Sequence, residues 1–130
     1  MSRKTILITY GLIALLGCST QQSLSPADNA LDAGREFIDA QLKGDFERAT
    51  FYMIDDAKQQ AWLKTAEENY RKLDRGGRQQ SREASINIAG VQEKHADTTL
   101  IQYSYSFDTT PKTLLVVRNN QQWKALPAYP

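Results

Sequence analysis

The chain has little of what most chemical sites require. Its 130 residues include one cysteine and one histidine. A single cysteine excludes an intramolecular disulfide, and one histidine with one cysteine cannot supply the three or four ligands of a zinc site. Glycine-rich phosphate loops, nucleophile elbows and calcium-loop spacings are also missing from the sequence. We therefore expect no metal and no cofactor, and we predict no catalytic residue.

A strong net charge of either sign is also missing. The chain carries 16 basic and 15 acidic residues, a net charge of +1. No overall field favours nucleic acid, so we expect no nucleic-acid partner. Basic residues cluster only within residues 71–82, where Glu67, Glu68, Asp74 and Glu83 interrupt or flank them. Such a mixed run predicts a solvated helix end and loop.

No apolar run is long enough to span a membrane as a helix, which takes about 20 residues. The longest run extends from Thr5 to Leu16 and follows two basic residues, Arg3 and Lys4. A short apolar run behind a positive start is typical of a secretory signal peptide. The run ends in Leu-Leu-Gly-Cys at residues 15–18.

This ending resembles the bacterial lipobox. The resemblance implies that a diacylglycerol is attached to the Cys18 sulfur, that a peptidase removes residues 1–17, and that the mature amino terminus is further acylated, for example with palmitate. Residues 18–24 are short and polar, which predicts a flexible tether. Two or more acyl chains anchor a protein stably. The alternative is an ordinary cleaved signal peptide followed by an incidental cysteine.

The resemblance also predicts a location. We expect the chain to be anchored on the periplasmic side of the cell envelope. In enterobacterial lipoproteins an aspartate after the lipidated cysteine marks retention in the inner membrane. Ser19 stands at that position, which favours the outer membrane.

Residues 25–130 are predicted to form a single α+β domain. Ser25 and Pro26 suit the start of a first helix, whose apolar residues recur at helical spacing as far as Leu42. Gly44 suits the residue after its end. Asp45 is then a candidate cap for a short second helix.

A third helix is expected from about residue 57 to residue 74, capped by Asp55 or Asp56 and ended by Arg75-Gly76-Gly77. Its predicted inward stripe comprises Ala61, Trp62, Ala66, Tyr70 and Leu73.

From about residue 83 the apolar period changes to two. This predicts four antiparallel strands in a meander, with a polar turn at residues 92–96, strands at 98–107, 113–118 and 123–126, and a turn at Asn119-Asn120. The segment 114–117 is apolar on both faces, so both of its sides are expected to be covered, by this chain or by a second copy in a homodimer through the sheet. Helices before an antiparallel sheet predict α+β, with the helices laid across one face of the sheet.

Three features together resemble a known group. They are the run A-x-x-x-F-I-D-A-Q-L-K-G-D-F-E-R-A at residues 33–49, the meander, and Trp123-Lys124 in the last strand. They resemble small bacterial lipoproteins of a domain-of-unknown-function family in the nuclear-transport-factor-two-like, or cystatin-like, superfamily. The resemblance implies a cone whose open end often holds a small ligand, in enzymes and non-enzymes alike. Such a fold does not determine a function.

The candidate ligand-contacting residues are aromatic. Tyr103 and Tyr105 share one face of the longest predicted strand, while Phe37 and Trp62 lie on the helical stripes. An aromatic stripe at strand spacing usually belongs to the core, and the alternative is a pocket wall.

Ionisable candidates are fewer. His95 lies in a predicted turn, where a solvated surface role is expected. Asp39, Asp55, Asp56 and Asp108 are the carboxylates that could reach the mouth of a cone, and an isomerase-like site would need one of them beside a tyrosine.

The sequence thus favours a non-enzymatic, membrane-anchored module that binds a small apolar ligand or an envelope protein. Two alternatives stay open: an isomerase-like or hydratase-like enzyme that uses a pocket carboxylate and a tyrosine, and a structural partner in an envelope complex.

Overall fold

The computed structural model describes residues 23–129. Residues 1–17, Cys18 and most of the expected tether lie outside this range, so the structure leaves the signal-peptide and lipidation predictions untested. Among the described residues, no helix combines the length and apolar character that crossing a membrane requires.

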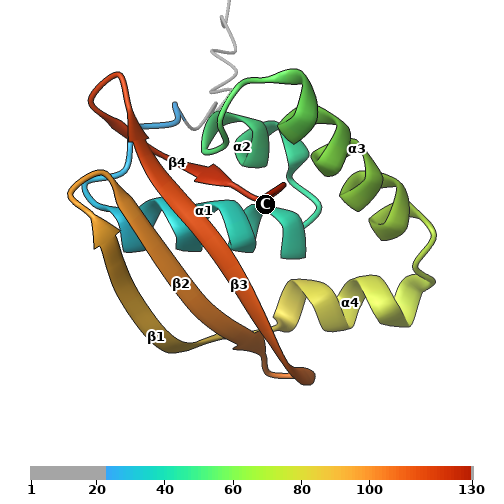
Figure 1. Ribbon diagram of the computed structural model, residues 1–130. Coiled ribbons are helices and arrows are strands. Elements are labelled where there is room, and N and C mark those ends of the chain that lie inside the picture. Colours follow the sequence, from blue (N-terminus) through green and yellow to red (C-terminus); the bar gives the residue numbers. More distant parts are fainter. Residues whose placement is uncertain (1–22, 130) are drawn as a thin grey trace, which may run out of the picture.

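Helices precede an antiparallel four-stranded sheet, and the prediction of an α+β fold is confirmed (Figure 1). The strands are adjacent in chain order, as expected for a meander. The elements are α1 (Ala30–Leu42), α2 (Phe46–Phe51), α3 (Ala57–Arg71), α4 (Arg75–Glu83), β1 (Ile86–His95), β2 (Thr98–Tyr105), β3 (Asp108–Asn119) and β4 (Gln122–Leu126).

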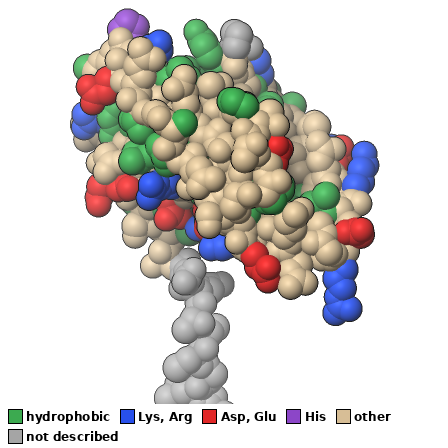
Figure 2. Space-filling model, turned by 90° about the horizontal axis from the view of Figure 1, so that it is seen from below, with side chains coloured by type: hydrophobic (Ala, Val, Ile, Leu, Met, Phe, Trp, Pro, Cys, Tyr) green, Lys and Arg blue, Asp and Glu red, His purple; other side chains and the backbone are tan. Residues whose placement is uncertain are grey.

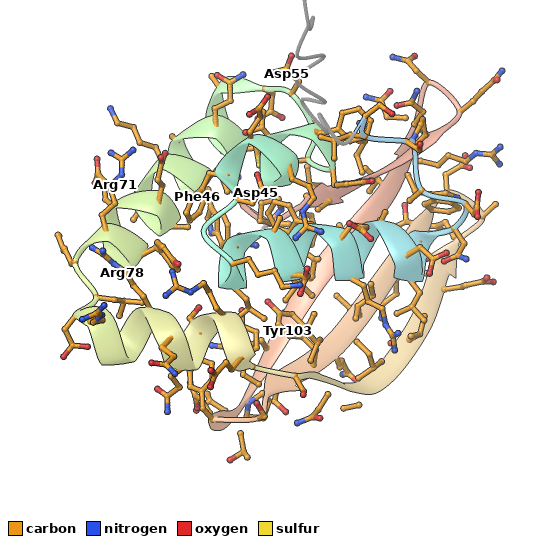
Figure 3. All side chains as sticks on the ribbon, turned by 180° about the vertical axis from the view of Figure 1, so that it is seen from behind. Asp45, Phe46, Asp55, Arg71, Arg78 and Tyr103 are labelled. Carbon is orange, nitrogen blue, oxygen red and sulfur yellow. The ribbon has the colours of Figure 1, made fainter. Side chains whose placement is uncertain are left out.

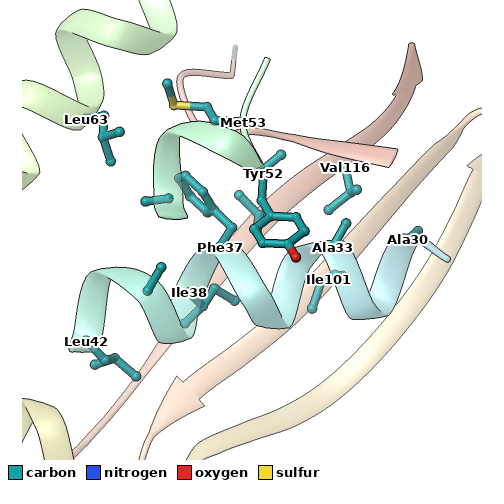
Figure 4. Close-up of a cluster of buried hydrophobic side chains, with 14 residues drawn as sticks. Ala30, Ala33, Phe37, Ile38, Leu42, Tyr52, Met53, Leu63, Ile101 and Val116 are labelled. Carbon is teal, nitrogen blue, oxygen red and sulfur yellow. The ribbon is translucent and has the colours of Figure 1, made fainter. Parts of the chain in front are cut away.

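The core lies between α1 and the face of the sheet that α1 crosses (Figure 1). Phe37 and Ile38 from α1 meet Ile101 of β2 and Val116 of β3, and all four side chains are almost completely buried (Figure 4). Gly34 permits this close approach, because a Cβ there would overlap the side chain of Ile101. The interior of the cone next to α1 is therefore filled by side chains.

The capping predictions are confirmed at two helices and wrong at one. The side chains of Asp45 and Asp56 accept hydrogen bonds from backbone N–H groups in the first turns of α2 and α3. The first helix, however, begins at Ala30 rather than beside Ser25. Asn29 caps it, because its Oδ1 accepts from the N–H of Asp32 at 2.8 Å.

Residues 75–77 were expected to end the third helix, but they form the first turn of a further helix, α4. α3 ends at Arg71, and the carboxylate of Asp74 caps α4 by accepting from Gly77 N–H at 2.7 Å. The Ser81 hydroxyl then donates to the Leu42 carbonyl at 2.7 Å, which joins α4 to the end of α1. Each of the two glycines lowers the stability of the helix by up to about 1 kcal/mol. The cap and this buried contact offset that cost.

The predicted inward stripe of α3 is also incorrect in part. α3 buries Gln59 and Leu63, whereas Trp62 is 38% exposed and Ala61 lies on the surface. A polar residue faces inward because the Gln59 side-chain oxygen accepts from Ala128 N–H at 2.8 Å. The buried amide is thereby satisfied.

β1, β3 and β4 are longer than predicted, β2 ends at Tyr105 rather than at residue 107, and the turns are tighter. β1 continues through the expected polar turn to His95, and its last residues are exposed because β1 is an edge strand. β3 begins at Asp108, immediately after a two-residue turn, and so includes Pro111. Proline is tolerated there because β4 pairs only with residues 115–119 of β3. Asn120 and Gln121, both with positive φ, form the last turn.

The segment 114–117 is covered on one face only within the described chain. Leu114 and Val116 are buried beneath α1, while Leu115 and Val117 point to the opposite face of β3 and are half-buried. The expected second cover is not supplied by the described residues.

Candidate functional site

The described surface contains an apolar groove where the end of α1 meets α3, α4 and the β2–β3 turn. It has a volume of about 200 Å³ and is mostly apolar. Hollows of about 310, 410 and 480 Å³ elsewhere on the described surface are larger, and each has a more polar lining. We therefore take the first groove as the candidate site. It is lined by Gln41, Leu42, Phe46, Ala66, Asn69, Tyr70, Leu73, Ser81, Tyr105 and Phe107.

The α1–α2 turn forms one wall of this groove. Gly44 adopts a φ of +71°, a conformation that other residues rarely take, and so ends α1 sharply. Asp45 then caps α2, which places Phe46 against Tyr70 of α3 in an edge-to-face contact of 5.8 Å between ring centroids (Figure 3). The turn chemistry that the sequence revealed thus positions an aromatic pair of the site.

The opposite wall is an aromatic ladder on β2. Tyr103 and Tyr105 lie on the same face of the strand with ring centroids 5.7 Å apart, and Phe107 stacks on Tyr105 at 5.4 Å. The ammonium group of Lys112 lies 5.3 Å from the Tyr105 ring centroid. Phe107 is 42% exposed because it occupies the two-residue turn rather than the strand. The ladder thus extends from the core at Tyr103 to the surface at Phe107.

Burial dominates the acid–base behaviour of the two tyrosines. It raises the pKa of Tyr103 well above the ordinary tyrosine value, and the neighbouring Tyr105 raises it further. Burial likewise raises the pKa of Tyr105, although a hydrogen bond with Tyr103 opposes the effect. Both hydroxyls therefore stay protonated at neutral pH and can act as hydrogen-bond partners rather than as bases.

The four aromatic candidates form two separate pairs. Tyr105 lines the groove and Tyr103 lies directly behind it. Phe37 is 1% exposed and lies within the core (Figure 4). Its ring packs against that of Trp62, with ring centroids 6.1 Å apart. Only Tyr105 is thus placed in the groove wall, and Phe37 is inaccessible from the surface.

Asp39 is engaged in an ion-pair network outside the groove. Its carboxylate accepts from Arg48 at 2.8 Å and lies 3.0 Å from Lys43. Partial burial opposes ionisation, yet the two cations hold the pKa of Asp39 below its usual range. Arg48 also pairs with Glu36 at 2.9 Å, so the network joins α2 to α1.

The remaining ionisable candidates have local partners or lie on the surface. Asp55 accepts from the Gln60 side chain, Asp56 caps α3, and Asp108 accepts from Thr110 N–H at 3.0 Å. Hydrogen bonds from the side chain and the backbone of Thr110 lower the pKa of Asp108. His95 is exposed at the end of β1. The lining of the groove contains none of these carboxylates. Within residues 23–129, no group of three or more His, Cys, Asp or Glu side chains is arranged for a metal ion.

The Trp123-Lys124 pair has a structural role. The Lys124 ammonium donates to the carbonyl of Phe51 at the end of α2 and lies 4.3 Å from the Phe51 ring centroid. Burial lowers the pKa of this lysine. The Arg118 guanidinium lies 6.0 Å from the Trp123 ring centroid. Lys124 therefore joins β4 to α2, and Trp123 contacts Arg118 across the β3–β4 hairpin.

Sequence reasoning did not identify the α3–α4 part of the groove. Leu73 was expected to be buried in a longer third helix, and Ser81 lies in a helix that was not predicted. One sequence signal could have predicted α4: Asp74 is a residue type that often caps a helix by accepting from the N–H three residues later. The two glycines that follow it instead suggested a loop.

Comparison with known proteins supports the fold. No protein-family profile and no curated protein matches the chain. Among solved structures, the chain is similar to an NTF-2-like protein of unknown function from Shewanella oneidensis MR-1, with 13% sequence identity and a TM-score of 0.53. The match covers 73% of this chain and 89% of that one. At this identity the similarity shows the NTF-2-like fold alone.

Proposed function

We propose that the chain is a lipid-anchored periplasmic module without enzymatic activity, and that it binds an envelope protein through the apolar groove. The observation that carries this proposal is the exposure of Leu73 (39%) and Phe107 (42%) at the rim of the groove. Exposed apolar side chains around a concave site are typical of a docking surface.

The size of the groove favours a protein over a small ligand. Pockets for small molecules usually measure about 300–1,000 Å³ and enclose most of the ligand. The groove is smaller, at about 200 Å³, and the space beside α1 is filled by side chains. An open groove of this size suits one or two apolar anchor side chains of a partner.

The chemistry of the lining argues against the isomerase-like alternative. That reaction needs a carboxylate with a raised pKa beside a tyrosine in an apolar pocket. Asp39 instead has a lowered pKa and lies outside the groove, and Asp108 is exposed with a lowered pKa.

The anchor and the groove lie at opposite ends of α1 in this proposal. The chain enters the domain at Ser25, whose carbonyl accepts from the Tyr52 hydroxyl at 2.7 Å. α1 begins shortly afterwards and is about 20 Å long, and the groove lies beyond its last residue, Leu42. Residues 18–24 reach at most about 24 Å. Lipidation at Cys18 would therefore hold the domain near the membrane, with the tether attached at the end of the domain remote from the groove.

Site-specific photo-crosslinking in cells tests the proposal. A photoreactive amino acid replaces Leu73 in the full-length protein, and a second variant carries it at Lys58, an exposed α3 residue that is absent from the groove lining. We expect a discrete crosslinked species from position 73 alone. Equal crosslinking from both positions, or none from position 73, would contradict docking at the groove.

A second copy of the chain is also proposed as a partner, at a different surface. Leu115 and Val117 give β3 an apolar outer face that the described residues leave half-exposed. Replacing both with threonine should convert a dimer to a monomer in analytical ultracentrifugation. If the wild-type protein is monomeric throughout the accessible concentration range, this part of the proposal is wrong.

A further inference from the structure

The helical end of the molecule carries a group of basic side chains with few acidic partners. Residues 71–82 contain five basic residues and one acidic residue, Asp74. Asp74 is occupied as the cap of α4. Arg71 pairs with Glu67 at 2.7 Å, whereas Lys72, Arg75, Arg78 and Arg82 form no ion pair within residues 23–129.

Three of these cations form a stripe on α4. Arg75, Arg78 and Arg82 are spaced at i, i+3 and i+7, so they share one face of the helix. Arg75 and Arg82 are exposed, while Arg78 is half-buried and donates to the Arg71 carbonyl at 2.7 Å. We call Arg75, Arg78 and Arg82 the arginine stripe.

The arginine stripe lies beside the apolar groove. Ser81, which is adjacent to Arg82 in sequence and one turn from Arg78, lines the groove and donates to the carbonyl of Leu42. The bond from Arg78 places its guanidinium at the carbonyl of Arg71, the last residue of α3 and two residues before the exposed Leu73 in sequence (Figure 3). The view from below shows hydrophobic side chains on this face, with Lys and Arg side chains toward the edge (Figure 2). One surface thus offers an apolar cavity and a row of positive charge.

We propose that the partner docks through an acidic amphipathic segment, whose apolar side chains enter the groove while its carboxylates face the arginine stripe. This inference rests on the proposed function and specifies the partner's chemistry. Guanidinium groups are well suited to paired recognition of carboxylates. Because complementary charges guide docking while buried apolar anchors supply most of the affinity, the two surfaces have separable roles.

An anionic membrane is a poorer match for the arginine stripe. The stripe lies at the end of the domain remote from Ser25, where the proposed anchor joins the chain. A lipid anchor at Cys18 would therefore attach the domain at the end opposite the stripe, so the stripe is not the surface next to the attachment point. An acidic segment of another protein meets no such restriction.

Binding of a defined peptide to the full-length protein in neutral nanodiscs tests this inference. The probe is a fluorescent helical peptide with leucine at every third or fourth position and glutamate elsewhere, and its partner probe has lysine in place of glutamate. We expect the acidic probe alone to bind, and more weakly as salt rises from about 50 to about 300 mM. The double variant Arg75→Glu/Arg82→Glu should weaken binding by about tenfold or more. The matched control Lys58→Glu/Lys94→Glu, which reverses two exposed charges elsewhere, should stay within about twofold of wild type.

The outcomes separate this inference from the proposed function. Three outcomes would overturn the acidic-partner inference: both probes bind equally, the acidic probe does not bind, or its binding is unchanged by the arginine reversals. If crosslinking from position 73 persists in any of these cases, the groove still docks a protein, but one of different chemistry. A further arm uses the mature chain without its lipid, that is residues 18–130 with Cys18→Ser. If it sediments with phosphatidylglycerol vesicles and the arginine reversals abolish this, the stripe is assigned to a membrane and the inference is overturned.

Discussion

At the residue scale, several polar side chains form hydrogen bonds that join one helix to another or to the segment after β4. Gln59 accepts from the backbone at Ala128, and Ser81 donates to the carbonyl of Leu42. Arg48 joins α2 to two carboxylates of α1, Glu36 and Asp39, at 2.9 and 2.8 Å. Removing one partner from such a contact leaves a buried group without a hydrogen bond, which costs about 1–3 kcal/mol. These residues therefore hold the helices in the arrangement that creates the groove.

The cap at Asp45 gives the first prediction. Its carboxylate accepts from Arg48 N–H at 3.1 Å, and without it the first turn of α2 loses its side-chain cap. Asp45→Ala should lower the free energy of unfolding by about 1 kcal/mol in urea melts. The control Glu47→Ala changes a neighbouring exposed carboxylate that caps nothing, and should stay within about 0.5 kcal/mol of wild type. Equal effects of the two changes would argue against the cap.

The buried hydroxyl of Tyr103 gives the second prediction, on pH dependence. Its folded pKa is raised above that of the unfolded chain, near 10, so the unfolded state loses this proton first as pH rises. The stabilising contribution is complete below pH 10 and is lost as the pH rises above it. Tyr103→Phe removes the titrating group, so its stability should fall less steeply than that of wild type above about pH 10. Chemical denaturation at several alkaline pH values measures the two slopes, and identical slopes would contradict the burial of this hydroxyl.

At the element scale, most of the fold follows from local signals in the sequence, and the groove does not. The helical spacing of Phe37 and Ile38, the stop at Gly44 and the two-residue period of the strands predicted α1, α2 and the meander. α4 was missed because Gly76 and Gly77 disfavour a helix locally, and its contact through Ser81 with Leu42 is a long-range one. The length of β1 was missed because an edge strand can be polar on both faces.

The α1–α2 turn gives the third prediction. In Gly44→Ala the new Cβ would lie 2.6 Å from the Tyr70 ring, at a backbone φ of +71° that alanine rarely adopts. The variant should lose about 1–3 kcal/mol of stability in thermal or urea melts. Gly76→Ala is the matched control, because it has space for a Cβ within α4 and should be neutral or stabilising by up to about 1 kcal/mol. A destabilised Gly76→Ala or an unaffected Gly44→Ala would contradict the turn geometry.

At the scale of the whole molecule, different parts of the NTF-2-like fold provide stability and the proposed binding surface. The core between α1 and the sheet is filled and provides stability, while the proposed docking surface lies where α3, α4 and the β2–β3 turn meet beyond the end of α1. The proposed anchor joins the opposite end of the domain, near Ser25 and Tyr52. In this account the lipid determines where the domain resides, and the groove determines what it engages there.

The lipid at Cys18 is the claim on which this account depends most, and mass spectrometry of the mature amino terminus tests it directly. Cells expressing the full chain are fed an alkyne-bearing fatty acid, and the membrane-bound protein is purified and digested. We predict an amino-terminal peptide that begins at Cys18, carries a thioether-linked diacylglycerol and contains the label, while a Cys18→Ser chain stays unlabelled and uncleaved. A mature wild-type chain that begins at another residue, or one with an unmodified thiol at Cys18, would contradict the account.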